Sequence, residues 1–168
     1  ADVFSDAPCF CDYPQLDKLF PGSKFVYLDR ALDKWIPSIQ MLLAKMHQQL
    51  DLKTGYLNPV LKRCMHKTFQ LAVVEDPLQS RHLEHCYQNH QQEVFQYFSE
   101  RNDLLKIDIS TPGSLRKLLT FLDCHHEEEG EFPLLNTGLL VDSWKNYKHP
   151  NKVNSNSAGV EHRKYFVF

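Results

Sequence analysis

The apolar and polar positions along the chain predict helices that alternate with two strands. Residues 23–29, SKFVYLD, form an apolar run with β-branched and aromatic side chains, which is typical of a buried strand. Residues 103–109, DLLKIDI, have the same character and are bounded by turn-forming residues on both sides. Over residues 31–50 the apolar side chains recur at spacings of three and four, which indicates an amphipathic helix. Pro37 falls inside that range, so we expect either a kinked helix or one that begins near Pro37.

Four further helices complete the pattern. Residues 14–22 predict a short helix closed by Pro-Gly, and residues 58–72 predict a second one. Residues 78–99 are mostly polar with few apolar positions, which indicates a helix on the outside of the domain with a partly solvent-exposed face. A helix over 114–123 is expected to be capped by one of three side chains, Ser110, Thr111 or Ser114. The order strand, helices, strand, helix predicts an α/β fold with a parallel sheet and crossover helices.

Composition narrows the class of protein without naming a function. The chain has 168 residues, 42% of them hydrophobic, which suits one globular domain. A net charge of −2 does not favour bulk binding to nucleic acid, and no apolar run reaches the length of a membrane span. No signal peptide is visible, and five irregularly spaced cysteines favour free thiols, so we expect a cytoplasmic protein. The first residue is alanine, so we expect a processed chain or part of a longer product.

One stretch carries candidate chemistry. Arg30 follows the first predicted strand and immediately precedes the long helix, in which Ser38 lies about two turns on. Ligands of open α/β sheets bind beyond the carboxyl ends of the strands, and a helix N-terminus there favours an anion. A guanidinium can form two parallel hydrogen bonds to a phosphate. The alternative is an ion pair of Arg30 with Asp29 or Asp33, with Ser38 an ordinary helix residue.

Other clusters are weaker candidates. His82, His85, Cys86 and His90 lie on one predicted helix at spacings that share a face, but a single helix rarely supplies a whole metal site, and a solvated helix face is the favoured interpretation. The sequence Cys-His-His at 124–126 reads as a loop. Cys9 and Cys11 are too close for an easy bridge, and no local signature supports cysteine catalysis. We therefore predict no metal site.

Three segments in order carry a resemblance to a known family. The stretch FPGSKFVYLDRALDKWIPSI (20–39), the stretch RNDLLKIDISTPGSLRKLLTFLD (101–123) and the stretch EFPLLNTG (131–138) resemble the sulfotransferases, over roughly residues 6 to 138. The resemblance implies a three-layer parallel sheet of the P-loop kinase type. It also implies 3′-phosphoadenosine 5′-phosphosulfate (PAPS) as sulfuryl donor, with Arg30 and Ser38 binding its 3′-phosphate and no metal required.

The chain also departs from the family pattern. The glycine-, serine- and threonine-rich loop that binds the 5′-phosphosulfate in the family has no counterpart here. We therefore expect residues 1–168 to be a single sulfotransferase-like domain that is incomplete at its N-terminus. A family member that has lost the loop and its activity is the other explanation.

Two further site assignments follow from the resemblance alone. The family's catalytic base lies shortly before the arginine-bearing strand, where this chain has FSDAPCF, so Asp6 is the candidate base. A turn or capping role before Pro8 is the alternative for Asp6. Arg163 and Lys164 match a late basic segment that contacts the donor's 3′-phosphate in the family, although Tyr165 stands where the family usually has glycine. The alternative is a C-terminal strand or arm with a solvated basic pair.

The sequence as a whole predicts a sulfotransferase that acts on a hydroxyl or amine acceptor. The alternative is a non-catalytic binding or interaction module with a decayed nucleotide site, and a nucleotide kinase is disfavoured because no Walker lysine is present. The polar helical segment between residues 50 and 100 is expected to lie over the acceptor side. The acceptor and the oligomeric state are open, and a homodimer is compatible with the sequence.

Overall fold

The computed structural model describes residues 3–124 and 130–132. The chain divides into two compact units, residues 1–108 and residues 109–168, and each is described by itself. The first unit contains both strands and the helices α1 to α4, and the second contains α5. In the described part of the chain, no helix is both long enough and apolar enough to cross a membrane.

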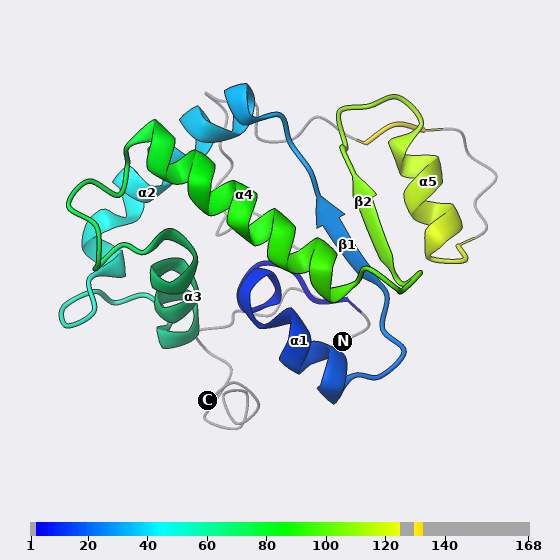
Figure 1. Ribbon diagram of the computed structural model, residues 1–168, viewed down its shortest axis with the longest axis horizontal. Coiled ribbons are helices and arrows are strands. Elements are labelled where there is room, and N and C mark those ends of the chain that lie inside the picture. Colours follow the sequence, from blue (N-terminus) through cyan, green and yellow to red (C-terminus); the bar gives the residue numbers. More distant parts are fainter. Residues whose placement is uncertain (1–2, 125–129, 133–168) are drawn as a thin grey trace, which may run out of the picture. The chain divides into compact units, whose positions relative to one another are not determined.

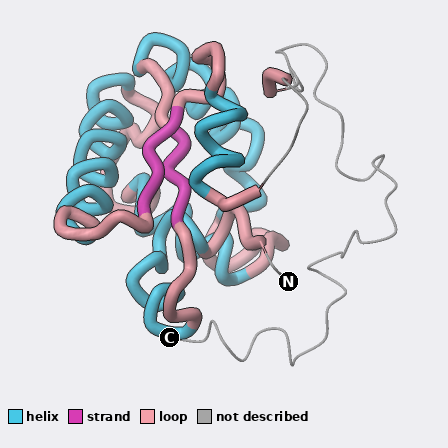
Figure 2. Tube along the Cα trace, turned by 90° about the vertical axis from the view of Figure 1, so that its right-hand side faces the viewer, coloured by secondary structure: helices cyan, strands magenta, loops and turns pink. Residues whose placement is uncertain are grey.

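The sheet of the first unit is parallel, as the order of elements predicts. Strands β1 (Phe25–Leu28) and β2 (Leu104–Ile107) pair in register, with Phe25 opposite Leu104 and Leu28 opposite Ile107 (Figure 2). Three helices lie between the two strands in the sequence, so the connection is a long crossover. The α/β class and the parallel pairing are confirmed for two strands, whereas a three-layer sheet stays an expectation.

Strand β1 is half-buried rather than buried on both faces. Tyr27 and Phe25 face α4, where their rings lie 5.2 Å and 4.8 Å from the rings of Phe95 and Phe98. On the other face, Val26 is 38% exposed and Leu28 is 63% exposed. The prediction of a buried strand is therefore wrong for one face, since the apolar run does not show which side chains are covered.

Figure 1 labels the four helices of the first unit that the structure describes. They are α1 (Cys9–Leu19), α2 (Leu32–Leu50), α3 (Pro59–Phe69) and α4 (Ser80–Tyr97). Helix α2 is continuous through Pro37 and begins at Leu32, so a start near Pro37 is excluded. Helix α1 begins earlier than predicted and leaves helical geometry at Asp12. At α3 the side chain of Asn58 accepts the Val60 N–H at 2.9 Å, and Pro59 occupies the first turn.

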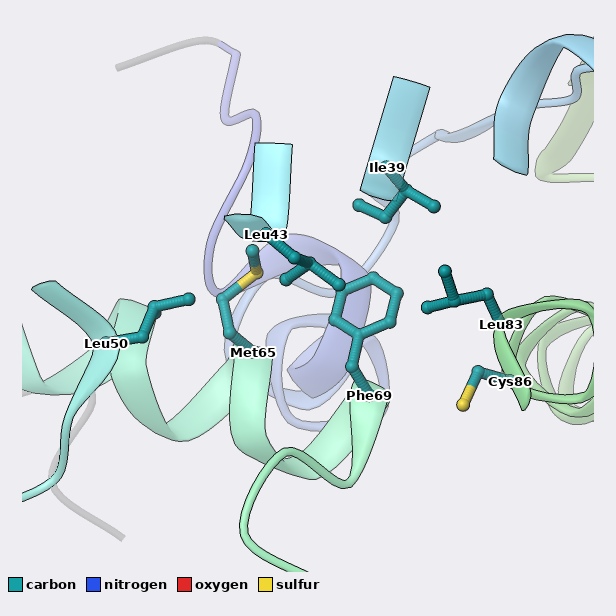
Figure 3. Packing of buried hydrophobic residues seen from close by; sticks show 7 residues of the cluster. All are labelled: Ile39, Leu43, Leu50, Met65, Phe69, Leu83 and Cys86. Atoms are coloured by element: carbon teal, nitrogen blue, oxygen red, sulfur yellow. The ribbon is translucent and has the colours of Figure 1, made fainter. Parts of the chain in front are cut away.

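The apolar core lies where α2 and α3 pack against α4. Figure 3 shows the Phe69 ring of α3 between Leu43 of α2 and Leu83 of α4. Leu83 is completely buried and Leu43 is 3% exposed. The apolar positions of α2 recur on one face, so burying that face holds the helix that follows Arg30 in place.

The second unit contains α5 (Ser114–Phe121). Its N-cap is Gly113, at φ +77°, so the prediction of a serine or threonine cap is wrong. The tight turn places a residue in the left-handed region directly before the helix, and glycine adopts that conformation without strain. The Gly113 N–H donates instead to the carboxylate of Glu131 at 2.9 Å.

Candidate functional site

Arg30 lies two residues beyond the carboxyl end of β1 and is exposed. Within the residues that the structure describes, no hydrogen bond or ion pair involves its guanidinium. In this part of the chain, neither of the ion pairs that the sequence leaves open for Arg30, with Asp29 or with Asp33, is formed. Asp29 instead pairs through Oδ2 with Lys106 Nζ at 3.1 Å. The arginine that we expected to meet an anion is therefore uncommitted in the described part of the chain.

Asp29 is satisfied by three side chains from two other elements. Its Oδ1 accepts hydrogen bonds from the Tyr87 hydroxyl at 2.6 Å and from Gln91 Nε2 at 3.0 Å, both on α4. Lys106 reaches it from β2. Partial burial raises the pKa of the Asp29 carboxyl, but the hydrogen bonds from Tyr87 and Lys106 outweigh burial and lower it below the ordinary value. Asp29 is thus a charged anchor for the end of β1.

Tyr87 also fixes the backbone of Arg30 itself. The Arg30 N–H donates to the Tyr87 hydroxyl oxygen at 3.3 Å, and that hydroxyl lies 3.0 Å from the Arg30 carbonyl oxygen. Burial raises the pKa of Tyr87, as does its hydrogen bond to Asp29, so the phenol stays protonated at neutral pH. Tyr87 therefore positions the backbone of Arg30 through its hydroxyl, and in the described residues it makes no hydrogen bond to the Arg30 guanidinium.

The helix that follows Arg30 begins without a side-chain cap. Its N-cap is Ala31, whose carbonyl oxygen accepts the N–H groups of Lys34 at 3.0 Å and Trp35 at 2.9 Å. In the described part of the chain, the N–H groups of Leu32 and Asp33 have no acceptor. Unpaired N–H groups and the helix dipole both favour an anion at this position.

Ser38 lies in the second turn of α2. It follows Ala31 by seven residues, which is nearly two full turns, so the two positions share a helix face. Its Cα is about 9 Å along the helix axis from Leu32. The side chain is half-buried, and its hydroxyl has no hydrogen-bond partner in the described residues.

Asp6 lies in the turn before α1 and is exposed. Its φ of +60° is in the left-handed region, which aspartate tolerates better than most residues. No hydrogen bond or ion pair joins Asp6 to Arg30 or Ser38 in the described residues. Asp6 thus has a clear conformational role in its turn, and its role as a base stays a prediction. Arg163 and Lys164 lie outside the described residues.

The histidines of α4 have structural partners. His82 Nε2 lies 2.9 Å from the Phe69 carbonyl oxygen, and His90 Nε2 lies 2.6 Å from the Phe10 carbonyl oxygen. Cys86 is 4% exposed and lies 3.4 Å from the His82 ring nitrogen. These three side chains face neighbouring elements, so the interpretation as a solvated face is wrong for them. Each histidine instead satisfies a carbonyl at a helix contact.

An open depression of about 400 Å³ lies beside the N-terminus of α4. It is lined by Val74, Glu75, Asp76, Gln79 and His82. None of the expected donor-site residues lines it.

The sequence did not identify Tyr87, Gln91 or Lys106 as part of the site. A tyrosine, a glutamine and a lysine at partly exposed positions have no local sequence pattern that indicates such a role. Only the pairing of segments far apart in the sequence brings them to Asp29.

Comparison with known proteins gives one result. Residues 1–139 match the family model described as a sulfotransferase domain. No curated protein and no solved structure matches the chain. The matched range includes Asp6, Arg30 and Ser38, and it ends before Arg163 and Lys164. Because the match covers most of the chain, this protein belongs to the sulfotransferase family.

Proposed function

We propose that the protein transfers a sulfuryl group from PAPS to a hydroxyl or amine, and that Arg30 and Ser38 bind the 3′-phosphate of the donor. The observation that carries the proposal is that, among residues 3–124 and 130–132, the Arg30 guanidinium has no hydrogen-bond or ion-pair partner and the N-terminus of α2 beside it has no side-chain cap. Tyr87 fixes the Arg30 backbone through its hydroxyl. Family membership supports PAPS as the donor in general terms.

Each residue has a definite task in this proposal. Arg30 donates two parallel hydrogen bonds to the phosphate, and the positive end of the α2 dipole favours the negative charge nearby. Ser38 donates its hydroxyl hydrogen to the same group. The acceptor oxygen bonds to the sulfur of the donor while Asp6 accepts the hydroxyl proton, the bond from that sulfur to the 5′-phosphate oxygen breaks, and 3′-phosphoadenosine 5′-phosphate leaves. The charge of Arg30 is accessible to solvent, which suits binding of an anionic nucleotide.

The test of catalysis is a kinetic comparison of Asp6→Asn with the wild-type full-length protein. Release of 3′-phosphoadenosine 5′-phosphate (PAP) is followed with PAPS and a panel of alcohols and amines. We expect Asp6→Asn to lower the turnover rate by about 10²- to 10⁴-fold, since a general base contributes that much. Its affinity for PAP should stay within about twofold of the wild-type value, because Asp6 does not contact the proposed phosphate ligands.

Two results would contradict this assignment. Full activity in Asp6→Asn would show that Asp6 serves only its turn. Tight binding of PAP by the wild-type protein, without transfer to any acceptor in the panel, would favour the non-catalytic binding module.

A further inference from the structure

A buried group of three possible metal ligands lies where α1 packs against α3. It consists of Cys11 and Asp12 from α1 and Cys64 from α3. Their two Sγ atoms and one carboxylate oxygen all lie within 4.8 Å of one another. Cys11 is 7% exposed, Asp12 is 2% exposed and Cys64 is completely buried. Acidic residues are seldom buried to this degree without a specific partner.

The kink of α1 explains how two consecutive residues contribute to one point. Side chains at adjacent helical positions point about 100° apart, so both rarely face the same neighbour. At Asp12 the backbone departs from helical geometry, with φ −117° and ψ 23°. This departure lets Cys11 and Asp12 face Cys64 together.

Hydrogen bonds already orient the carboxylate. Arg63 donates from both terminal nitrogens to Asp12, with Nη1 at 2.9 Å from Oδ1 and Nη2 bonded to Oδ2. The Cys11 thiol donates to the same Oδ1 at 3.2 Å. Arg63 therefore holds the carboxylate, and its Nη1 also lies 3.9 Å from Cys11 Sγ.

We propose that Cys11, Asp12 and Cys64 bind one thiophilic divalent cation, with Zn²⁺ as the best match, while Arg63 holds the Asp12 carboxylate. The cation takes the place of the thiol protons, and two protons leave to solvent as two thiolates form. A hydrogen bond from a second residue to a ligating carboxylate is the usual arrangement around such ions. The three residues supply three ligands of a tetrahedral ion, a solvent molecule takes the fourth position, and the ion joins α1 to α3 without taking part in sulfuryl transfer.

Charge and distance both fit this occupant. Two thiolates and one carboxylate carry three negative charges, which Zn²⁺ and the Arg63 guanidinium together neutralise. Zinc–sulfur bonds of about 2.3 Å place two tetrahedral sulfurs about 3.8 Å apart, so ligand atoms within 4.8 Å need to move by only about 1 Å. Sulfur ligands disfavour Mg²⁺ and Ca²⁺, which prefer oxygen.

The test uses Co²⁺ and Zn²⁺ with the reduced full-length protein. Co²⁺ bound by thiolates gives a strong near-ultraviolet charge-transfer band, which histidine nitrogen ligands do not give, so the nine histidines of the chain do not mimic the signal. We expect the band at one equivalent of Co²⁺ in the wild-type protein and its loss on addition of Zn²⁺. Cys11→Ala and Cys64→Ala should lose the band and bind Zn²⁺ at least about 100-fold more weakly.

The control is Cys124→Ser, because Cys124 is an exposed free thiol outside the cluster. It should keep the band and the affinity. Since replacing a buried cysteine can unfold the protein, X-ray absorption of the zinc-loaded wild-type protein provides an independent readout, with two sulfur neighbours at about 2.3 Å expected. A shell of nitrogen and oxygen alone, absence of the band in the wild-type protein, or loss of the band only in Cys124→Ser would overturn the proposal.

Discussion

Within the described residues the Arg30 guanidinium has no hydrogen-bond or ion-pair partner, because the neighbouring carboxylate is satisfied by other groups. Asp29 is paired with Lys106 and accepts hydrogen bonds from Tyr87 and Gln91. Without those partners, Asp29 would be the nearest counter-ion for Arg30, and an anionic ligand would have to compete with it. The spacing between Arg30 and Ser38 predicted Arg30 as a candidate. The contacts that satisfy Asp29, and so prevent it from pairing with Arg30, could not be predicted from the sequence.

Tyr87→Phe tests whether donor binding depends on the hydrogen bonds between the Tyr87 hydroxyl and the backbone of Arg30. The ring would keep its packing against Trp35, whose centroid lies 4.7 Å away, and lose only the hydroxyl contacts. We expect affinity for PAP to fall by about 3- to 10-fold, the equivalent of one hydrogen bond of ordinary strength. Calorimetric titration measures the change, with Tyr56→Phe as the control, because Tyr56 is 79% exposed. Equal affinities in Tyr87→Phe and the wild-type protein would show that Tyr87 has no positioning role.

A second polar cluster, formed by Arg101, Asp17 and Asp103, predicts how the stability of the protein changes at acidic pH. Arg101 donates to Asp17 from Nη1 at 2.5 Å and from Nη2 at 2.8 Å, and it also pairs with Asp103. The Arg101 hydrogen bonds lower the pKa of Asp17 from the usual value near 3.8 to about 2. A carboxyl with a lowered pKa stabilises the folded state above the unfolded value, and this stability is lost as the pH falls through the folded value.

Asp17→Asn should therefore be less stable than the wild-type protein at pH 5, and the difference should shrink between about pH 4 and pH 2. Urea unfolding of both proteins across that range measures it. Because other carboxyl groups titrate in the same range, the difference between the two proteins is the informative quantity. A difference that does not change with pH would show that Asp17 acts through packing rather than charge.

Helix boundaries were predictable where the apolar periodicity is long. The expected helix over 31–50 is α2 (Leu32–Leu50), and the apolar face that revealed it is the face that packs in the core. The start of α1 was predicted too late, because a proline is typical of the first turn of a helix and Pro14 therefore indicates a helix that begins there. Pro14 lies in the turn that follows the kink at Asp12, where a proline is tolerated, and a first helical segment precedes it. The glycine N-cap of α5 was missed because its hydrogen bond goes to Glu131, which lies beyond the helix.

Two neighbouring leucines of α2 test the account of its buried face. Leu43 is 3% exposed, whereas Leu42 is 43% exposed. Leu43→Ala should lower the free energy of unfolding by about 2–5 kcal/mol, because it leaves a cavity beside Phe69. Leu42→Ala should cost less than about 1 kcal/mol, and the two variants change helix propensity equally. Denaturant unfolding gives both values, and equal losses would contradict the assignment of the core.

For the molecule as a whole, the order of the elements was enough to predict a parallel pair of strands. β1 and β2 are separated by three helices in the sequence, and a crossover of that length returns the chain in the same direction. The contacts made across that distance were not predictable. Tyr87 with Arg30, and Cys11 with Cys64, meet only because α1, α3 and α4 pack together, and nothing in the local sequence of either partner indicates the other.

The central claim is that Arg30 recognises the 3′-phosphate of the donor. The direct measurement is calorimetric titration of PAP and of adenosine 5′-phosphate, which lacks that group, into the full-length protein and Arg30→Ala. Arg81→Ala is the matched control, since Arg81 is an exposed arginine on α4. We predict that the wild-type protein and Arg81→Ala bind PAP about 10- to 100-fold more tightly than adenosine 5′-phosphate, and that Arg30→Ala loses most of this preference. An unchanged preference in Arg30→Ala, or no preference in the wild-type protein, would contradict the claim.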